Sequence, residues 1–137
     1  MLPTMQKNDI KYELISLASK NDDIAALWLY GSRSNGSSNA NSDYDLAVLF
    51  TNRLNDPLES RLRPELLAID WVKLLGVKEG VISVVDVQIV PIPLAINAIS
   101  GTLLYCADQD ARLMTESVIM SKVELDYLYQ QKLEEKK

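Results

Sequence analysis

Two aspartates at strand spacing are the first residues in this sequence whose types and positions could do chemistry. Asp43 and Asp45 are separated by one residue and open an apolar segment that ends at Phe50. Side chains two residues apart in a strand share one face and lie about 7 Å apart along the strand. Two such carboxylates can converge on one Mg²⁺, which prefers hard oxygen ligands and keeps part of its hydration. The spacing therefore predicts a magnesium site.

Asp86 is a third acid, and it stands among β-branched residues in the segment 84–88. A carboxylate in such a strand is costly to bury without a partner. If the two strands are neighbours, Asp86 can share the metal ions with Asp45 and accept the proton of an incoming hydroxyl group, as in two-metal in-line transfer. The alternative is a buried acid that bonds to backbone groups or pairs with Lys or Arg. The sequence leaves both interpretations open.

A turn rich in small residues precedes the aspartate pair and begins with Gly31-Ser32-Arg33. Gly31 can adopt a positive φ and lets the backbone come close to a ligand, while the amide and hydroxyl of Ser32 can donate to phosphate oxygens. Arg33 adds a charged fork suited to the same anion. The turn therefore indicates a nucleotide triphosphate site. An ordinary loop remains the alternative for the segment, and a surface cation remains the alternative for Arg33.

Composition excludes several other classes of site. The chain contains no histidine, which rules out Ser-His-Asp and Cys-His nucleophile systems and zinc sites that need imidazole. Its net charge of -5 is the wrong sign for binding nucleic acid through phosphates. Cys106 is the single cysteine, so no intrachain disulfide can form. With no signal pattern and no apolar segment long enough to span a bilayer, we expect a cytoplasmic protein without membrane contact.

The elements that must position these residues follow from the apolar pattern. A first helix is expected from 8 up to the turn at 21–23, and strands are expected at 24–30, 43–50, 81–90 and 102–106. Further helices are expected at 63–75, at 93–100 and from 108 to about 130, followed by a frayed tail at 131–137. The predicted fold is one α/β domain over 1–137. It has a short mixed sheet of three or four strands, helices packed on one face, and the metal site on the other face near the strand starts.

The last predicted helix has a wider apolar surface than one core contact needs. One stripe of apolar residues comprises Met114, Val118, Leu125 and Leu128, and a second comprises Leu113, Met120 and Tyr127. Such a surface is either core or a docking face for another protein.

The Gly-Ser turn, the Asp-x-Asp strand and the later strand acid together resemble the nucleotidyltransferase superfamily of the DNA polymerase β type, and most closely its minimal, MntA-like branch. The resemblance covers roughly residues 24–105. It implies transfer of AMP from ATP with the help of two Mg²⁺ ions. The residues implied to hold the metals and carry catalysis are Asp43, Asp45 and Asp86, and those implied to hold the triphosphate are Gly31, Ser32 and Arg33.

MntA-like proteins act as antitoxins to HEPN-domain ribonucleases of the HepT kind. The resemblance therefore implies AMP transfer to a tyrosine of a HepT-like toxin within a hetero-oligomer, which would silence the ribonuclease. Size also favours a protein acceptor, because 137 residues leave no room for a second domain that grips a small one. Two alternatives remain, namely an antitoxin that acts by binding alone and a nucleotidyltransferase for small molecules such as antibiotics.

Overall fold

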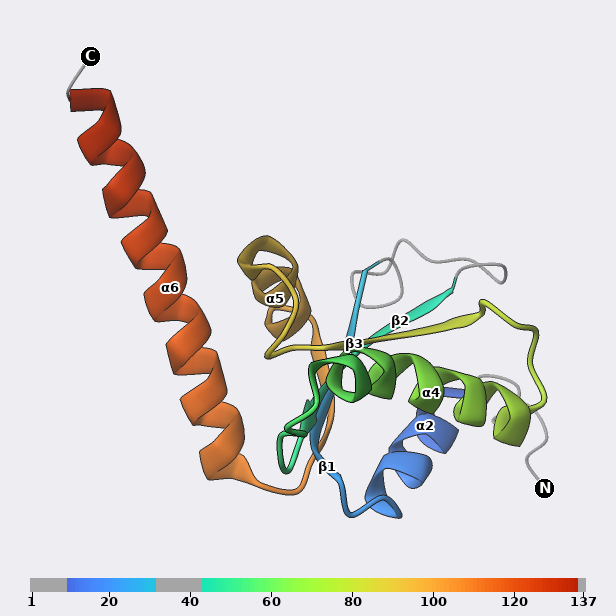
Figure 1. Ribbon diagram of the computed structural model, residues 1–137. Helices are drawn as coiled ribbons and strands as arrows, with labels where there is room; N and C mark the ends of the chain where they lie inside the picture. Colours follow the sequence, from blue (N-terminus) through green and yellow to red (C-terminus); the bar gives the residue numbers. More distant parts are fainter. Residues whose placement is uncertain (1–9, 32–42, 136–137) are drawn as a thin grey trace.

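The computed structural model describes residues 10–31 and 43–135. The elements follow one another as α2 (Ile10–Ser19), β1 (Ile24–Tyr30), β2 (Tyr44–Phe50), α4 (Pro57–Leu75), β3 (Ile82–Asp86), α5 (Ile92–Ile99), β4 (Thr102–Cys106) and α6 (Gln109–Glu135) (Figure 1). The predicted α/β class with a short mixed sheet is confirmed, since the strands form one four-stranded sheet.

The sheet brings separate parts of the chain to one end. The strand order is β3-β2-β1-β4. β1 pairs antiparallel with both β2 and β4, while β2 pairs parallel with β3. As a result, the last residues of β1 meet the first residues of the other three strands. We call this the Asp45 end of the sheet, because Asp45 lies there opposite Tyr30.

Helices cover both faces of the sheet, which corrects the expectation of helices on one face only. One core cluster joins the sheet to α2 and α4 through residues such as Leu14 and Trp71. The other joins the opposite face to α5 and α6 through Ala95, Ala98 and Ile119. The physical reason lies in β1, whose seven residues are all apolar and all buried. A strand that is apolar on both sides needs a packed layer on each face.

The start of α4 and the end of β3 differ from the prediction, and each difference has a local cause. α4 begins six residues early because the carboxylate of Asp56 accepts a hydrogen bond from the Leu58 amide at 2.9 Å and Pro57 occupies the first helical position. β3 ends four residues early because the chain turns directly after Asp86, where the amides of Ile89 and Val90 donate to the Asp86 carbonyl.

α6 stands apart from the rest of the molecule over its outer part (Figure 1). The helix is 27 residues long, and Ile119 is its one buried residue. It continues through Glu135, beyond the predicted end near 130. No helix in the described part of the chain is long and apolar enough to cross a membrane.

Candidate active site

Gly31 and Asp45 come into contact at the Asp45 end of the sheet. Antiparallel pairing sets Tyr30 beside Asp45, and Gly31 follows with a φ of 75°. A Cβ atom added to Gly31 would lie 2.6 Å from the Asp45 Oδ2 atom, so any larger residue would force the carboxylate to move. Only glycine therefore combines this backbone conformation with this carboxylate position.

Negative charge is concentrated at this contact. Burial raises the pKa of the Asp45 carboxyl above its usual value, and the nearby Asp43 carboxylate raises it further. Burial also raises the pKa of the Tyr30 phenol, with a smaller contribution from Asp45. Within residues 10–31 and 43–135, neither Asp43 nor Asp45 forms an ion pair. A bound cation would relieve the repulsion between the Asp43 and Asp45 carboxylates.

The donor set at this position suits Mg²⁺. Two carboxylates supply hard oxygen ligands, and the exposure of Asp43 leaves room for water and phosphate oxygens around the ion. Gly31 belongs to the predicted triphosphate turn and lies against Asp45. Ser32 and Arg33, the other two residues expected to hold the triphosphate, lie outside the described residues.

Asp86 does not join this pair, which corrects the expectation of a three-aspartate centre. In the parallel pairing of β2 with β3, Asp45 lies beside Ser83 while Asp86 lies beside Val48. A shift of three residues turns a side chain to the other face of a sheet. Val48 packs in the cluster under α2 and α4, whereas Asp45 faces the α5 and α6 side. Among the described residues, which include all three aspartates, no group of three potential ligands can hold a metal ion.

Asp86 instead closes β3 as a buried structural acid, the alternative left open by the sequence. It is 7 % exposed, and its carboxylate accepts a hydrogen bond from the Gln88 amide at 2.9 Å. Burial raises its pKa, while the Gln88 hydrogen bond and the charges of Arg53 and Arg63 lower it. This buried acid therefore fixes the turn from β3 toward α5.

Arg63 ties α4 to the loop that follows β2. Its guanidinium donates to the Asn52 carbonyl at 2.9 Å and lies 4.0 Å from the centre of the Phe50 ring. It also forms an ion pair of 3.6 Å with Asp23. These contacts hold the Arg63 charge near enough to the buried Asp86 to lower its pKa, and they lie away from the Asp45 end.

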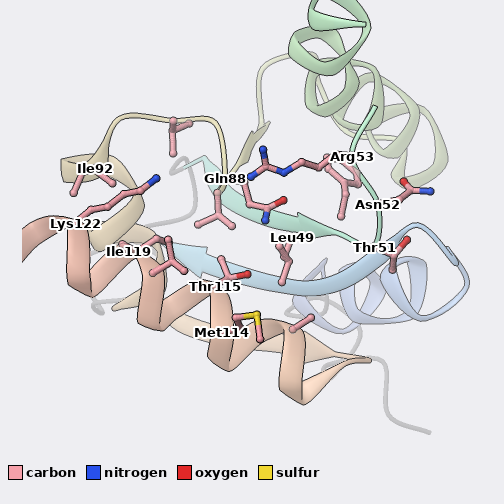
Figure 2. Close-up of a pocket in the computed structure, with 15 residues that line it drawn as sticks. Leu49, Thr51, Asn52, Arg53, Gln88, Ile92, Met114, Thr115, Ile119 and Lys122 are labelled. Carbon is pink, nitrogen blue, oxygen red and sulfur yellow. The ribbon is translucent and has the colours of Figure 1, made fainter. Parts of the chain in front are cut away.

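A cavity lies beside α6, at the end of β2 that is far from Asp45. It has a volume of about 410 Å³ and lies between Leu49, the turn after β3 and the inner side of α6 (Figure 2). Met114, Val118 and Ile119 supply much of its apolar wall, and its charged lining residues are Arg53 and Lys122. It contains no carboxylate, which makes it unsuitable for Mg²⁺. Its apolar wall is continuous with the exposed surface of α6.

An Asp-x-Asp strand in contact with a glycine turn, at the end of a mixed sheet covered by helices, is the arrangement of a nucleotidyltransferase domain. Residues 12–110 match the polymerase beta nucleotidyltransferase family. The chain belongs to this family, and the predicted class of enzyme is confirmed. A comparison with curated proteins finds no significant match.

Solved structures with the same fold include several toxin-antitoxin complexes. A toxin-antitoxin crystallised with AMP-PNP has a TM-score of 0.65 and 24 % identity, over 92 % of this chain and 97 % of that one. An MntA-HepT toxin-antitoxin has a TM-score of 0.60 and 21 % identity, over 91 % and 94 %. The complex of a tri-AMPylated Shewanella oneidensis HEPN toxin with its MNT antitoxin has a TM-score of 0.59 and 20 % identity, over 91 % and 93 %. At these identities the likeness shows the fold.

The contact between Gly31 and Asp45 predicts that Gly31→Ala is more destabilising than Gly76→Ala. Both glycines have a positive φ, 75° and 67°, so each substitution carries a backbone cost of about 1–2 kcal/mol. Only at Gly31 does the new Cβ meet a carboxylate, since nothing lies within 4 Å at Gly76. Urea denaturation of both variants measures the difference. Equal losses in the free energy of unfolding would contradict the contact.

The position of Asp86 predicts that it plays no part in binding the cation. Asp86→Asn keeps an oxygen that accepts from the Gln88 amide, so we expect the rise in Tm on adding Mn²⁺ to match the wild type. Asp45→Asn should abolish that rise. Asp86→Ala removes the acceptor and should lower the free energy of unfolding by about 1–3 kcal/mol. If Asp86→Asn showed no rise in Tm on adding Mn²⁺, Asp86 would be a ligand of the cation after all.

Proposed function

We propose that this protein transfers AMP from ATP to a tyrosine hydroxyl of a HEPN ribonuclease toxin and thereby acts as its antitoxin. The observation that carries the proposal is the contact of Gly31 with Asp45 in a chain of the polymerase beta nucleotidyltransferase family. Two solved structures of the same fold support this choice of nucleotide and acceptor. One is a toxin-antitoxin with AMP-PNP and the other contains an AMPylated HEPN toxin.

In this proposal Asp43 and Asp45 hold one Mg²⁺, and Gly31, Ser32 and Arg33 bind the triphosphate. When bound, the cation neutralises charge on the phosphate oxygens. The acceptor oxygen forms a bond to the α-phosphorus, the bond from that phosphorus to the pyrophosphate oxygen breaks, and the hydroxyl proton passes to water. The second ion expected from the sequence depended on Asp86, which lies on the other face of the sheet, so the proposal includes one cation held by the protein.

The toxin would dock on the apolar stripe of α6. This stripe, made of Met114, Val118, Leu125 and Leu128, is 48–69 % exposed. Met114 and Val118 also line the cavity beside the sheet, whereas Leu125 and Leu128 lie further along the helix toward its C-terminal end. Exposed apolar residues gathered on one side of a helix are typical of an interface. Toxin-antitoxin complexes of the same fold make the toxin the occupant we propose.

Neutralisation of the toxin by binding alone is the second candidate function. What favours it is that the apolar stripe lies on α6, a helix that contributes no residue to the Asp45 end of the sheet. Binding of the toxin by α6 therefore does not require AMP transfer at the Asp45 end. A variant without Asp43 and Asp45 separates the two functions, because only the catalytic antitoxin loses protection with those carboxylates.

The catalytic proposal predicts a labelled toxin. With Mg²⁺, α-labelled ATP and the proposed HEPN toxin, sought as the product of the neighbouring gene, the wild-type protein should transfer label to the toxin. Asn at both Asp43 and Asp45 should reduce the rate by about 10²–10³-fold or more, since a metal contributes several kcal/mol to the transition state. Asp86→Asn is the matched control and should still transfer label to the toxin.

No transfer by the wild type, or undiminished transfer by the double variant, would contradict the proposal. Continued protection of cells by the double variant would establish binding alone.

The docking proposal predicts that Leu125→Glu weakens the complex with the toxin. A charge placed in an apolar interface should reduce affinity by about tenfold or more, measured by calorimetry. Leu66→Glu on α4 is the matched control, because Leu66 and Leu125 are similarly exposed, at 60 % and 66 %. We expect that control to bind as the wild type does. Equal affinities for both variants would exclude the α6 stripe as the docking surface.

A further inference from the structure

Ser83 occupies the place on β3 that lies beside Asp45. The parallel pairing of β2 with β3 makes these two residues direct neighbours, and adjacent strands lie about 4.8 Å apart. Ser83 is exposed, although the residues on either side of it in the strand, Ile82 and Val84, are buried. A polar, accessible side chain therefore stands next to the carboxylate pair.

The pleat of the sheet turns Ser83 and Asp45 to the same side. Ile82 and Val84 pack in the cluster under α2 and α4, so Ser83 faces the opposite layer. Asp45 faces that layer too, because Ala47, two residues further along β2, belongs to the cluster beneath α5 and α6. Asp86 fails both conditions, since it lies three residues further along β3 and on the other face.

We propose that Ser83 is the third residue of the metal site and that its neutral side chain limits the site to the charge of two carboxylates. This inference rests on the proposed function, which assigns the cation to Asp43 and Asp45. Cation affinity in oxygen sites follows the number and charge of the ligands. The remaining oxygens around the ion then come from water or from the triphosphate.

Adding a carboxylate at this place tests the inference. Mn²⁺ binding without nucleotide, followed by electron paramagnetic resonance of the free ion, gives an affinity for each variant independent of catalysis. We expect Ser83→Asp to bind Mn²⁺ at least about tenfold more tightly than the wild type, because the ligand set gains a charge. Ser83→Asn has nearly the same size without the charge and should bind as the wild type does. Gln88→Glu adds the same charge beyond the far end of β3 and should also change nothing.

Thermal denaturation provides a second measurement on the same proteins. In EDTA, Ser83→Asp should melt below Ser83→Asn, because a third negative charge joins Asp43 and Asp45 with no cation to balance it. Excess Mn²⁺ should reverse the order of the two Tm values. The neutral Ser83→Asn variant shows whether the larger side chain itself disturbs the fold.

The outcomes separate this inference from the proposed function. If Asp45→Asn abolishes Mn²⁺ binding while Ser83→Asp binds no more tightly than the wild type, Ser83 lies away from the ion and the inference is overturned, although the metal site stands. If Gln88→Glu tightens binding as much as Ser83→Asp, the effect is one of overall charge and the inference also fails. If neither the wild type nor Ser83→Asp binds Mn²⁺, the cation site of the proposed function fails with it.

Discussion

The antiparallel register between β1 and β2 is the constraint on which the site depends. It sets Tyr30 opposite Asp45 and so brings the left-handed turn at Gly31 against the Asp45 carboxylate. A slip of one residue would turn Asp45 into the core under α2 and α4, where Leu46 and Val48 now pack. The apolar side chains of β2 therefore fix the register, because exposing them to water is costly. The fixed register in turn holds the Asp45 carboxylate in place.

The two faces of the sheet carry acidic residues in different surroundings. On the α2 and α4 side, β2 buries Tyr44, Leu46 and Val48, and the carboxylate nearby, that of Asp86, closes a turn and lies near arginines. On the other side, Asp45 and Ser83 lie next to each other at the end of the sheet. Negative charge lies near protein cations on the first face, and in the proposed function a bound cation balances it on the second. The same residue type thus has two roles, set by its surroundings.

Local patterns in the sequence were enough to predict most of the helices and strands, and a glycine bend beside an aspartate pair. Gly31 directly follows β1, and Asp43 directly precedes β2 while Asp45 lies in it, so short-range rules were enough to place these residues at strand ends. Asp86 was assigned wrongly because its role depends on the register between β2 and β3. Two strands separated by a whole helix carry no local signal of that register. The same missing register hides the neighbour of Asp45 on β3, which is Ser83.

Other differences have equally specific causes. The continuous apolar sequence of β1 already required cover on both faces, and Asp56 with Pro57 already marked the start of α4. The breadth of the apolar surface on α6 was visible in the sequence, but whether it was core or interface was not. The structure shows that this surface is not core, since most of it is exposed.

The central claim is that Asp43 and Asp45 alone among the aspartates of the sheet hold the cation. Crystals soaked in Mn²⁺ and measured at a wavelength where manganese scatters anomalously would locate the ion directly. The account predicts a peak bridging the carboxylates of Asp43 and Asp45 beside Gly31, and none at Asp86. A peak coordinated by the Asp86 carboxylate would contradict it.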